Sequence, residues 1–271
     1  ASLSVLVVII TGLALWGLEG QASSLVSTDN KPVHQQDFKQ VLASVWNEPQ
    51  AKAFTVFVFL SMLAYSAQDL ILEPFAGATF GLTPGETTQL SGLHHSAVLC
   101  GMLIVALAGS SWMAGRMGSV QSWMVGGCVV SGVAMVGLCM AGLSGPPWPL
   151  KANVFLLGVA NGSFSIAAIA TMMRLATQGG EDRAGTRMGL WGAAQAIAFG
   201  VGGLLGTGAS DLSHWFVHAQ GTAYAWVFGF EALMFAMSAA CAVWVGRYDA
   251  PRTPSLSVPA SHHSKELGHE Y

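Results

Sequence analysis

The stretch AFTVFVFLSMLAYSAQDLIL, residues 53–72, decides the fold class, because one charged side chain, Asp69, interrupts a run that is otherwise almost entirely apolar. A helix needs about 20 mostly apolar residues to cross the hydrocarbon core of a bilayer. The run shows no polar–apolar alternation of the kind found in barrel strands. Its backbone can be satisfied in lipid only as a helix, so the stretch predicts a transmembrane helix.

Six more stretches of the same kind occur along the chain. They are Ala1–Leu18, Leu93–Met113, Ser122–Leu143, Ala152–Met173, Gly185–Gly208 and Ala223–Val245. Of the 271 residues, 52% are hydrophobic and 9% are charged, whereas a soluble domain carries about 25% charged residues. The sequence therefore predicts an all-α polytopic membrane protein with seven transmembrane helices in a lipid bilayer.

Composition and motifs exclude several classes of function. The formal net charge of −3 gives no electrostatic case for nucleic-acid binding. The four cysteines lie in apolar runs without metal-site spacing, so we expect small buried side chains, no metal site and no disulfide framework. No Walker loop, Rossmann fingerprint, nucleophile elbow or zinc-protease motif is present, so we predict no catalytic residues and no enzyme.

The basic residues predict the orientation of the helices. Ten of the 11 Lys and Arg residues fall on one side of the predicted membrane, and Lys151 alone falls on the other. Cytoplasmic loops carry an excess of Lys and Arg, so the ten-residue side is predicted to be cytoplasmic, together with the C-terminus.

Four regions follow from this layout. Residues 1–18 read as a truncated transmembrane helix and residues 19–52 as a cytoplasmic linker. Within this linker, Phe38 to Trp46 carry apolar residues at helical spacing, which predicts a short amphipathic helix on the membrane surface. Residues 53–247 form a six-helix membrane domain, and residues 248–271 a disordered cytoplasmic tail.

Two boundaries in the membrane domain carry local signals. Glu73-Pro74 is expected to end the second span, since proline commonly stops a helix. Thr83-Pro84-Gly85-Glu86 has the pattern of a capping box with proline at the first helical position. The next helix is therefore predicted to begin near Pro84, which places His94 and His95 inside it.

Two carboxylates lie in the second span. Asp69 and Glu73 are four residues apart and share one helix face. Carboxylates at membrane depth are costly and usually face a cavity or a partner, which suggests a site for a cofactor headgroup or a proton. A hydrated position near the periplasmic interface remains the alternative, especially for Glu73.

His94 and His95 are the candidate ligands. Neighbouring residues on a helix point about 100° apart, so the two imidazoles should serve different surroundings. A neutral imidazole is a common metal ligand and could provide one axial ligand to the magnesium of a bacteriochlorophyll. Hydrogen bonding to neighbouring helices or interfacial water is the alternative.

Small and amide residues mark helix contacts. Gly158 and Gly162, and likewise Gly202 and Gly206, form small-xxx-small patterns that let helices, or a flat macrocycle, approach the backbone. Asn161 and Gln195 are amides within spans that we expect to bond across helices, and Glu231 is a further membrane carboxylate with no evident partner.

Six spans after a long cytoplasmic loop match the second half of a major facilitator protein, which joins two six-helix halves. The first predicted span would then be the last helix of the N-terminal half, and residues 53–247 the C-terminal half. The turn Gly109 to Gly118 resembles the facilitator turn motif, with Gly115 in the place of the usual Asp before Arg116. The charge-relay role of that motif is therefore not expected.

Three blocks resemble the PucC/LhaA-type bacteriochlorophyll-delivery family of the major facilitator superfamily. They run from Trp46 to Gly77, including Glu-Pro-Phe-Ala-Gly; from Gly158 to Met173; and from Ala184 to Gly203, including Trp-Gly-Ala-Ala-Gln-Ala. Together with the layout, the resemblance covers nearly all of the chain except the tail, and corresponds to the C-terminal half of the family.

The resemblance implies a light-harvesting assembly factor that binds or delivers bacteriochlorophyll in the photosynthetic intracytoplasmic (inner) membrane. Expected ligands are bacteriochlorophyll and a carotenoid, and expected partners are antenna polypeptides, the reaction centre, and a missing N-terminal half or second chain. The candidate pigment-binding residues are His94, His95, Asp69, Glu73, Asn161, Trp191 and Gln195. A small-solute secondary transporter and a structural subunit of a photosynthetic complex remain alternatives.

Overall fold

Long apolar helices make up the part of the chain that the structure, a computed structural model, describes: residues 38–109, 118–178, 181–216 and 220–247. Six of them are long and apolar enough to cross a membrane. They are α4 (Pro49–Phe80), α5 (Pro84–Ala108), α6 (Val120–Ser144), α7 (Leu150–Gln178), α8 (Glu181–Phe216) and α9 (Gln220–Arg247). These helices confirm the predicted all-α membrane protein, whereas the predicted span at 1–18, the 110–117 turn and the tail lie outside the described residues.

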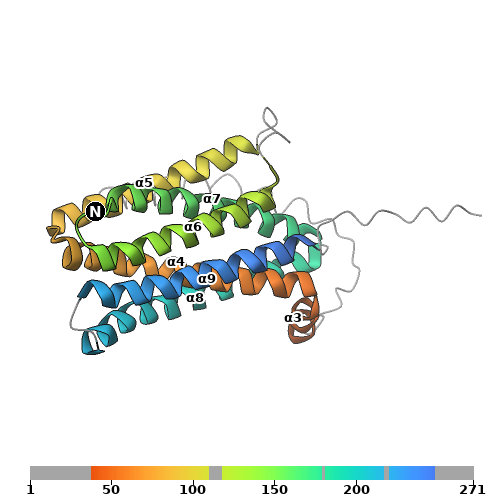
Figure 1. Cartoon of the computed structure of the whole chain (residues 1–271). Coiled ribbons are helices and arrows are strands. Elements are labelled where there is room, and N and C mark those ends of the chain that lie inside the picture. Colours follow the sequence, from red (N-terminus) through yellow and green to blue (C-terminus); the bar gives the residue numbers. More distant parts are fainter. Residues whose placement is uncertain (1–37, 110–117, 179–180, 217–219, 248–271) are drawn as a thin grey trace, which may run out of the picture. The chain divides into compact units, whose positions relative to one another are not determined.

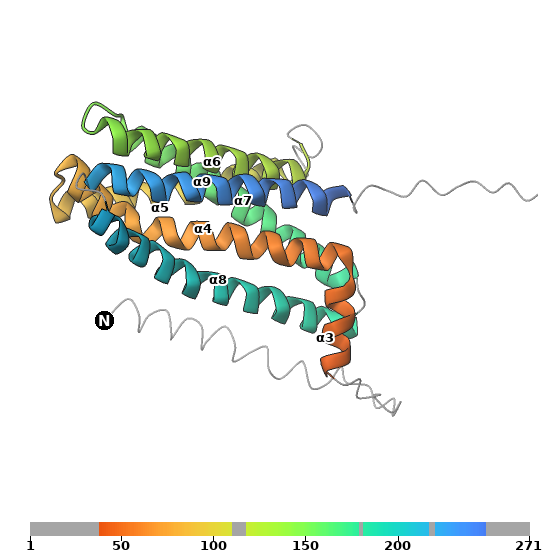
Figure 2. The same cartoon turned by 60° about the horizontal axis from the view of Figure 1, so that its bottom comes forward.

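The six long helices run side by side, and α3 (Phe38–Asn47) lies across them at the end where α4 begins (Figures 1 and 2). Except for the contact between α6 and α7, the main contacts join helices that are not neighbours in sequence. α5 packs on α7, α7 on α6, α6 on α9, α9 on α4, and α4 on α8. Smaller contacts join α4 to α5 and α4 to α7, which brings side chains of α4, α5 and α7 together.

Aromatic and small aliphatic side chains form the core between these helices. Phe75 of α4 contacts Phe228 of α9 edge-to-face, with ring centroids 4.8 Å apart, and Tyr224 at 5.5 Å. In contrast, only 17% of the α8 span and 33% of the α5 span are buried, against 61% of α4. Most of the surface of α5 and α8 is therefore left for lipid or for a partner.

Glycines set the close approach of α5 and α7. A Cβ on Gly158 would lie 2.5 Å from the carbonyl oxygen of His94, and one on Gly162 would collide with the carbonyl group of Val98. A Cβ on Gly202 of α8 would lie 2.8 Å from the carbonyl oxygen of Leu63, and one on Gly206 would lie 3.0 Å from that of Ala67, both on α4. Both small-xxx-small patterns are therefore helix contacts, as predicted.

Helix ends confirm one of the predicted boundaries and correct the other. α3 ends at Asn47, and α5 begins at Pro84, where the Glu86 carboxylate accepts the Thr83 N–H at 2.8 Å. The expected stop at Glu73-Pro74 is wrong, because α4 continues through Pro74 to Phe80.

Proline is tolerated inside α4 because it removes only one helical hydrogen bond, and its ring faces outward at an exposed position. The helix stops instead at Gly81, whose φ of 68° suits glycine and whose N–H donates to the carbonyl oxygen of Gly77 at 3.0 Å.

The cysteine prediction is corrected at one position. Cys128 is buried and Cys139 and Cys241 are half-buried, but Cys100 is exposed on the outward face of α5. An apolar run does not reveal which of its faces the bundle covers. The exposure of Cys100 could therefore not be predicted from the sequence.

Candidate functional site

Three polar contacts join α4 to α5 in the halves of the two helices that lie nearer their connecting loop, residues 81–83. They are Gln68 with His94, Asp69 with His95, and Glu73 with Ser91. The two helices run in opposite directions, so residues later in α4 meet residues earlier in α5. Glu73, half-buried, accepts a hydrogen bond of 2.5 Å from the Ser91 hydroxyl. The shared helix face predicted for Asp69 and Glu73 is thus turned toward α5.

The first of these contacts continues into the bundle as a chain of buried side chains. Ser131 of α6 donates to Asn161 Oδ1 of α7 at 2.8 Å. Asn161 Nδ2 donates to Gln68 Oε1 at 3.2 Å, and the Gln68 amide nitrogen lies 3.2 Å from His94 Nε2. All four side chains are buried, so this network ties α4, α5, α6 and α7 together where lipid and water are excluded.

The direction of these hydrogen bonds determines which ring nitrogen of a neutral His94 carries the proton. Because the Gln68 oxygen already accepts from Asn161, its NH₂ group must donate to His94 Nε2. A neutral His94 then carries its proton on Nδ1, which has no hydrogen-bond partner among the described residues. His94 is 0% exposed and contacts Gln68 of α4. This arrangement corresponds to the alternative considered for His94, a histidine bonded to a neighbouring helix.

His95 has the opposite environment. Its side chain is 57% exposed, and Nδ1 lies 2.9 Å from the carbonyl oxygen of Ser91, one turn earlier in α5. A carbonyl oxygen can only accept, so Nδ1 carries the proton and the neutral ring leaves a lone pair on Nε2. A ring nitrogen with its proton bonded to a backbone carbonyl is the usual arrangement of a metal-binding histidine.

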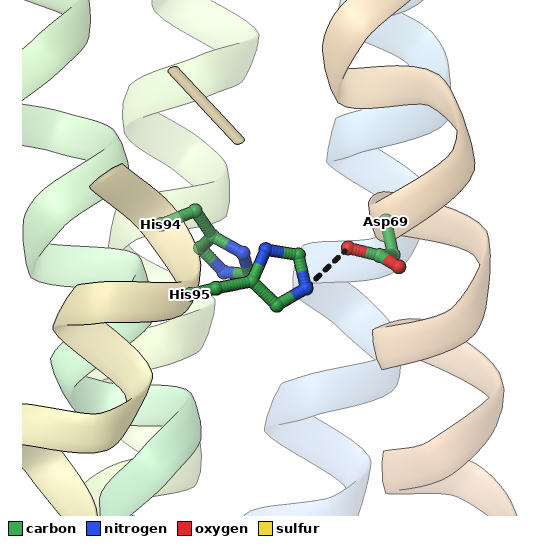
Figure 3. Close-up of side chains that lie close together, drawn as sticks. All are labelled: Asp69, His94 and His95. Carbon is green, nitrogen blue, oxygen red and sulfur yellow. Dashed lines mark ion pairs between the residues drawn. The ribbon is translucent and has the colours of Figure 1, made fainter. Parts of the chain in front are cut away.

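Asp69 faces this nitrogen. Its Oδ1 atom lies 3.8 Å from His95 Nε2, and its side chain is 41% exposed. One potential ligand atom from each of Asp69, His94 and His95 lies within 4.8 Å of the other two (Figure 3). This grouping offers cation-binding chemistry that the sequence did not predict, since the three residues have no recognised metal-site spacing.

Two of the predicted pigment-binding residues lie elsewhere. Trp191 is fully buried and packs edge-to-face on Phe54, with ring centroids 5.0 Å apart. Gln195 is exposed on α8, and within the described ranges no hydrogen bond joins it to the α4–α5 contacts. The structure brings together Asp69, Glu73, His94, His95 and Asn161, whereas roles in pigment binding for Trp191 and Gln195 stay predictions.

Sequence reasoning missed three contributors near these contacts. Ser131 completes the buried network, and Tyr65 lies with its ring centroid 6.5 Å from that of His94 and 6.3 Å from that of Phe199. Gly92, three residues before His95, has open space where a side chain would stand. Serine, tyrosine and glycine are common in membrane helices, so no sequence signal distinguishes these positions.

A second buried polar contact lies at the end of the bundle that carries α3. Arg187 of α8 forms an ion pair with Glu48, just before α4, and donates to the carbonyl oxygen of Leu175 near the end of α7. Glu231 of α9, by contrast, is buried, and both its carboxyl oxygens lack a hydrogen-bond partner within the described part of the chain.

The bundle and its polar contacts between α4 and α5 define a multi-pass helical membrane protein with an exposed histidine–carboxylate pair. A family model described as PUCC protein matches residues 1–249. The chain therefore belongs to the PucC family.

Curated relatives agree with this membership. The chain is 47% identical over 250 residues to the "Bacteriochlorophyll synthase 44.5 kDa chain" of Rhodobacter capsulatus, covering 92% of this chain and 56% of the relative. It is 30% identical to an uncharacterized protein of the puhA-bchM intergenic region of Rhodobacter capsulatus, covering 78% of this chain and 42% of that protein. It is 28% identical to the protein PucC of Rhodobacter capsulatus, covering 87% of this chain and 50% of that protein.

The chain thus spans about half the length of these relatives. No solved structure matches the chain.

Proposed function

We propose that this protein acts in the assembly of bacterial light-harvesting complexes, where it binds bacteriochlorophyll and passes it to antenna polypeptides without catalysing a reaction. Its membership of the PucC family and its likeness to a protein named for bacteriochlorophyll synthesis support this proposal. A carotenoid and the reaction centre belong to the same proposal as further contacts of the assembling complex.

One structural observation carries the proposal: Asp69 and His95 are both exposed on helices that are long and apolar enough to cross a membrane. An ionisable side chain facing lipid at the centre of a helix costs about 2.5–3.5 kcal/mol, so such residues normally face a partner or a cavity. The α4–α5 face around these residues is therefore covered in the working protein, by pigment, by an antenna helix or by a second six-helix half.

The proposal extends to location. The distribution of Lys and Arg supports a cytoplasmic C-terminus, and pigment delivery would require the photosynthetic inner membrane. In this orientation, the end of the bundle with α3 and the Arg187–Glu48 pair faces the cytoplasm.

Deletion of the gene in its phototrophic host tests the function. We expect the near-infrared antenna absorption per cell to fall while the antenna polypeptide messages persist, and the intact gene to restore it. Unchanged antenna absorption in the deletion strain would overturn the proposal, and altered uptake of a small solute would favour a secondary transporter.

A further inference from the structure

We propose that Asp69, His94 and His95 together bind one divalent transition-metal ion, such as Zn²⁺, which joins α4 to α5. The proposal goes beyond the proposed function, because this site requires neither a pigment nor an antenna polypeptide. It assigns a chemical task to three side chains that helix packing brings together.

The first step is the pair of exposed donor atoms. The Ser91 carbonyl oxygen accepts the Nδ1 proton of His95 at 2.9 Å, which leaves the Nε2 lone pair for a ligand. Asp69 Oδ1 faces this nitrogen at 3.8 Å (Figure 3). A tetrahedral ion about 2.1 Å from each of two ligand atoms holds them about 3.4 Å apart, so a bare ion fits between Asp69 and His95.

The second step adds His94 as the third ligand. One ligand atom from each of the three side chains lies within 4.8 Å of the other two, and rotation of the exposed Asp69 and His95 side chains shortens these distances. His94 is 0% exposed, and its Nδ1 atom has no hydrogen-bond partner among the described residues. Buried polar atoms are rarely left without a partner, and an ion would provide one.

Binding through Nδ1 changes the tautomer of His94 but not its charge. The Nδ1 proton leaves, and Nε2 takes up a proton that the Gln68 side-chain oxygen accepts once the amide group has turned over. Asn161 turns in the same way, so that its oxygen accepts from Gln68 and its nitrogen donates to the Ser131 hydroxyl oxygen. Because each of these groups both donates and accepts, the buried network reverses its direction without losing a contact.

The third step is charge and ligand type. Asp69 lies in a membrane-spanning helix, and His95 is its ion-pair partner among the described residues. A neutral imidazole leaves the carboxylate charge uncompensated, whereas a divalent cation neutralises it. One carboxylate and two imidazoles suit Zn²⁺ and similar transition metals, while Mg²⁺ prefers oxygen ligands alone.

An ion at this point would strengthen a weak helix contact. α4 and α5 touch far less than α5 and α7 do, and their side-chain bonds lie in the halves near the connecting loop. A ligand that binds only the folded protein stabilises it, so the bound ion should raise the temperature of unfolding.

The test uses the full chain, purified in mild detergent with an affinity tag that contains no histidine and freed of metal with a chelator. Co²⁺ is titrated first, because its visible absorption reports the geometry and type of its ligands, and Zn²⁺ or Mg²⁺ is then added as a competitor. We expect one Co²⁺ per chain at this site, displacement by Zn²⁺ but not by Mg²⁺, and a higher thermal midpoint in Zn²⁺.

Four variants locate the ion. Asp69→Asn, His94→Gln and His95→Gln each remove one ligand, and each is expected to weaken Co²⁺ binding by at least about tenfold, equivalent to about 1.4 kcal/mol. Glu73→Gln is the matched control, because Glu73 lies one turn further along the same face of α4 but accepts a hydrogen bond from Ser91 and is not one of the three ligands. It should bind Co²⁺ as the wild type does.

Two results would overturn the proposal. Unchanged Co²⁺ binding in folded Asp69→Asn and His95→Gln would place the ion elsewhere, for example on the tail residues His262 and His263. Unchanged binding in folded His94→Gln would reject the three-ligand site. Circular dichroism checks the fold, and Asp69→Asn, which preserves the side-chain shape, keeps the test decisive if a histidine variant unfolds. Pigment binding is measured separately, so loss of the metal site leaves the proposed function standing.

Discussion

At the scale of single residues, Asn161 is the most important member of the buried network that runs from Ser131 to His94. Asn161 both donates to Gln68 and accepts from Ser131, so its loss leaves two buried groups without partners. We predict that Asn161→Ala lowers the free energy of unfolding by about 1–2 kcal/mol, because bonds between membrane helices average about 0.6 kcal/mol each and unsatisfied partners add to the cost.

Thermal unfolding in detergent measures this effect. Ser163→Ala is the control on the same helix, because among the described residues the Ser163 hydroxyl bonds only to the carbonyl oxygen of Val159, one turn earlier. An Asn161→Ala variant as stable as Ser163→Ala would show that the network contributes nothing to stability.

Replacing Glu231 should have the opposite effect on stability. Its two buried oxygens have no hydrogen-bond partner among the described residues, so its burial is costly. We predict that Glu231→Met, which has a similar volume, raises the free energy of unfolding by about 1–3 kcal/mol. Ser238→Ala, two turns further along the same face of α9 and with a bond to the backbone carbonyl oxygen of Met234, serves as the control. A clear loss of stability in Glu231→Met would mean that the carboxyl group has a partner in the working protein.

The sequence predicted the residue types at the site better than their surroundings. Spacing alone put Asp69 and Glu73 on one face and set His94 and His95 at different angles. It did not show which histidine is buried, because that depends on Gln68 meeting Asn161, 93 positions later. Contacts of this range arise from helix packing, which local periodicity does not encode.

At the scale of helices, glycines hold α5 against α7 and so position His94 and His95. We predict that Gly162→Ala destabilises the protein by about 1–3 kcal/mol, because the added methyl group would meet the backbone of Val98 and force the helices apart. Gly192→Ala on α8 is the control, since its Cβ would meet open space.

Thermal midpoints of the two glycine variants decide this prediction. Gly192→Ala should be neutral or slightly stabilising, since alanine favours a helix more than glycine does. Equal midpoints for both variants would contradict the close packing of α5 and α7.

Arg187 connects the ends of three helices. We predict that Arg187→Ala lowers stability by about 1–3 kcal/mol, since it leaves Glu48 and the Leu175 carbonyl oxygen without this donor. Arg187→Lys should recover only part of the loss, because an ammonium group cannot reproduce the two-sided contact of a guanidinium group. Proteolysis of detergent-solubilised protein measures opening at this end. Full recovery by lysine would show that charge alone matters.

A helix boundary could be predicted from the sequence where neighbouring residues form the cap. The prediction failed where the packing of the bundle decides whether the helix continues. Thr83, Pro84 and Glu86 marked the start of α5, whereas Pro74 wrongly suggested a stop. Proline ends helices in water because it frees a backbone carbonyl group, but in a packed membrane bundle the helix can continue through it.

At the scale of the whole molecule, the described helices form one bundle whose α5 and α8 surfaces are mostly uncovered. The relatives are about twice as long, so a second set of helices is the natural candidate to cover part of this surface. The sequence predicted the number and type of the described spans, because apolar length is set by bilayer thickness. Apolar length does not show which helices pack against one another, because that depends on tertiary contacts between residues far apart in the sequence.

Under the proposed function, this protein carries bacteriochlorophyll during antenna assembly. The most direct measurement is the absorption spectrum of the protein purified gently from photosynthetic membranes, with its pigments extracted and its co-purifying polypeptides identified. We predict a near-infrared bacteriochlorophyll band in fixed ratio to the protein, and antenna polypeptides in the same fraction. A colourless, folded protein without antenna polypeptides would contradict it.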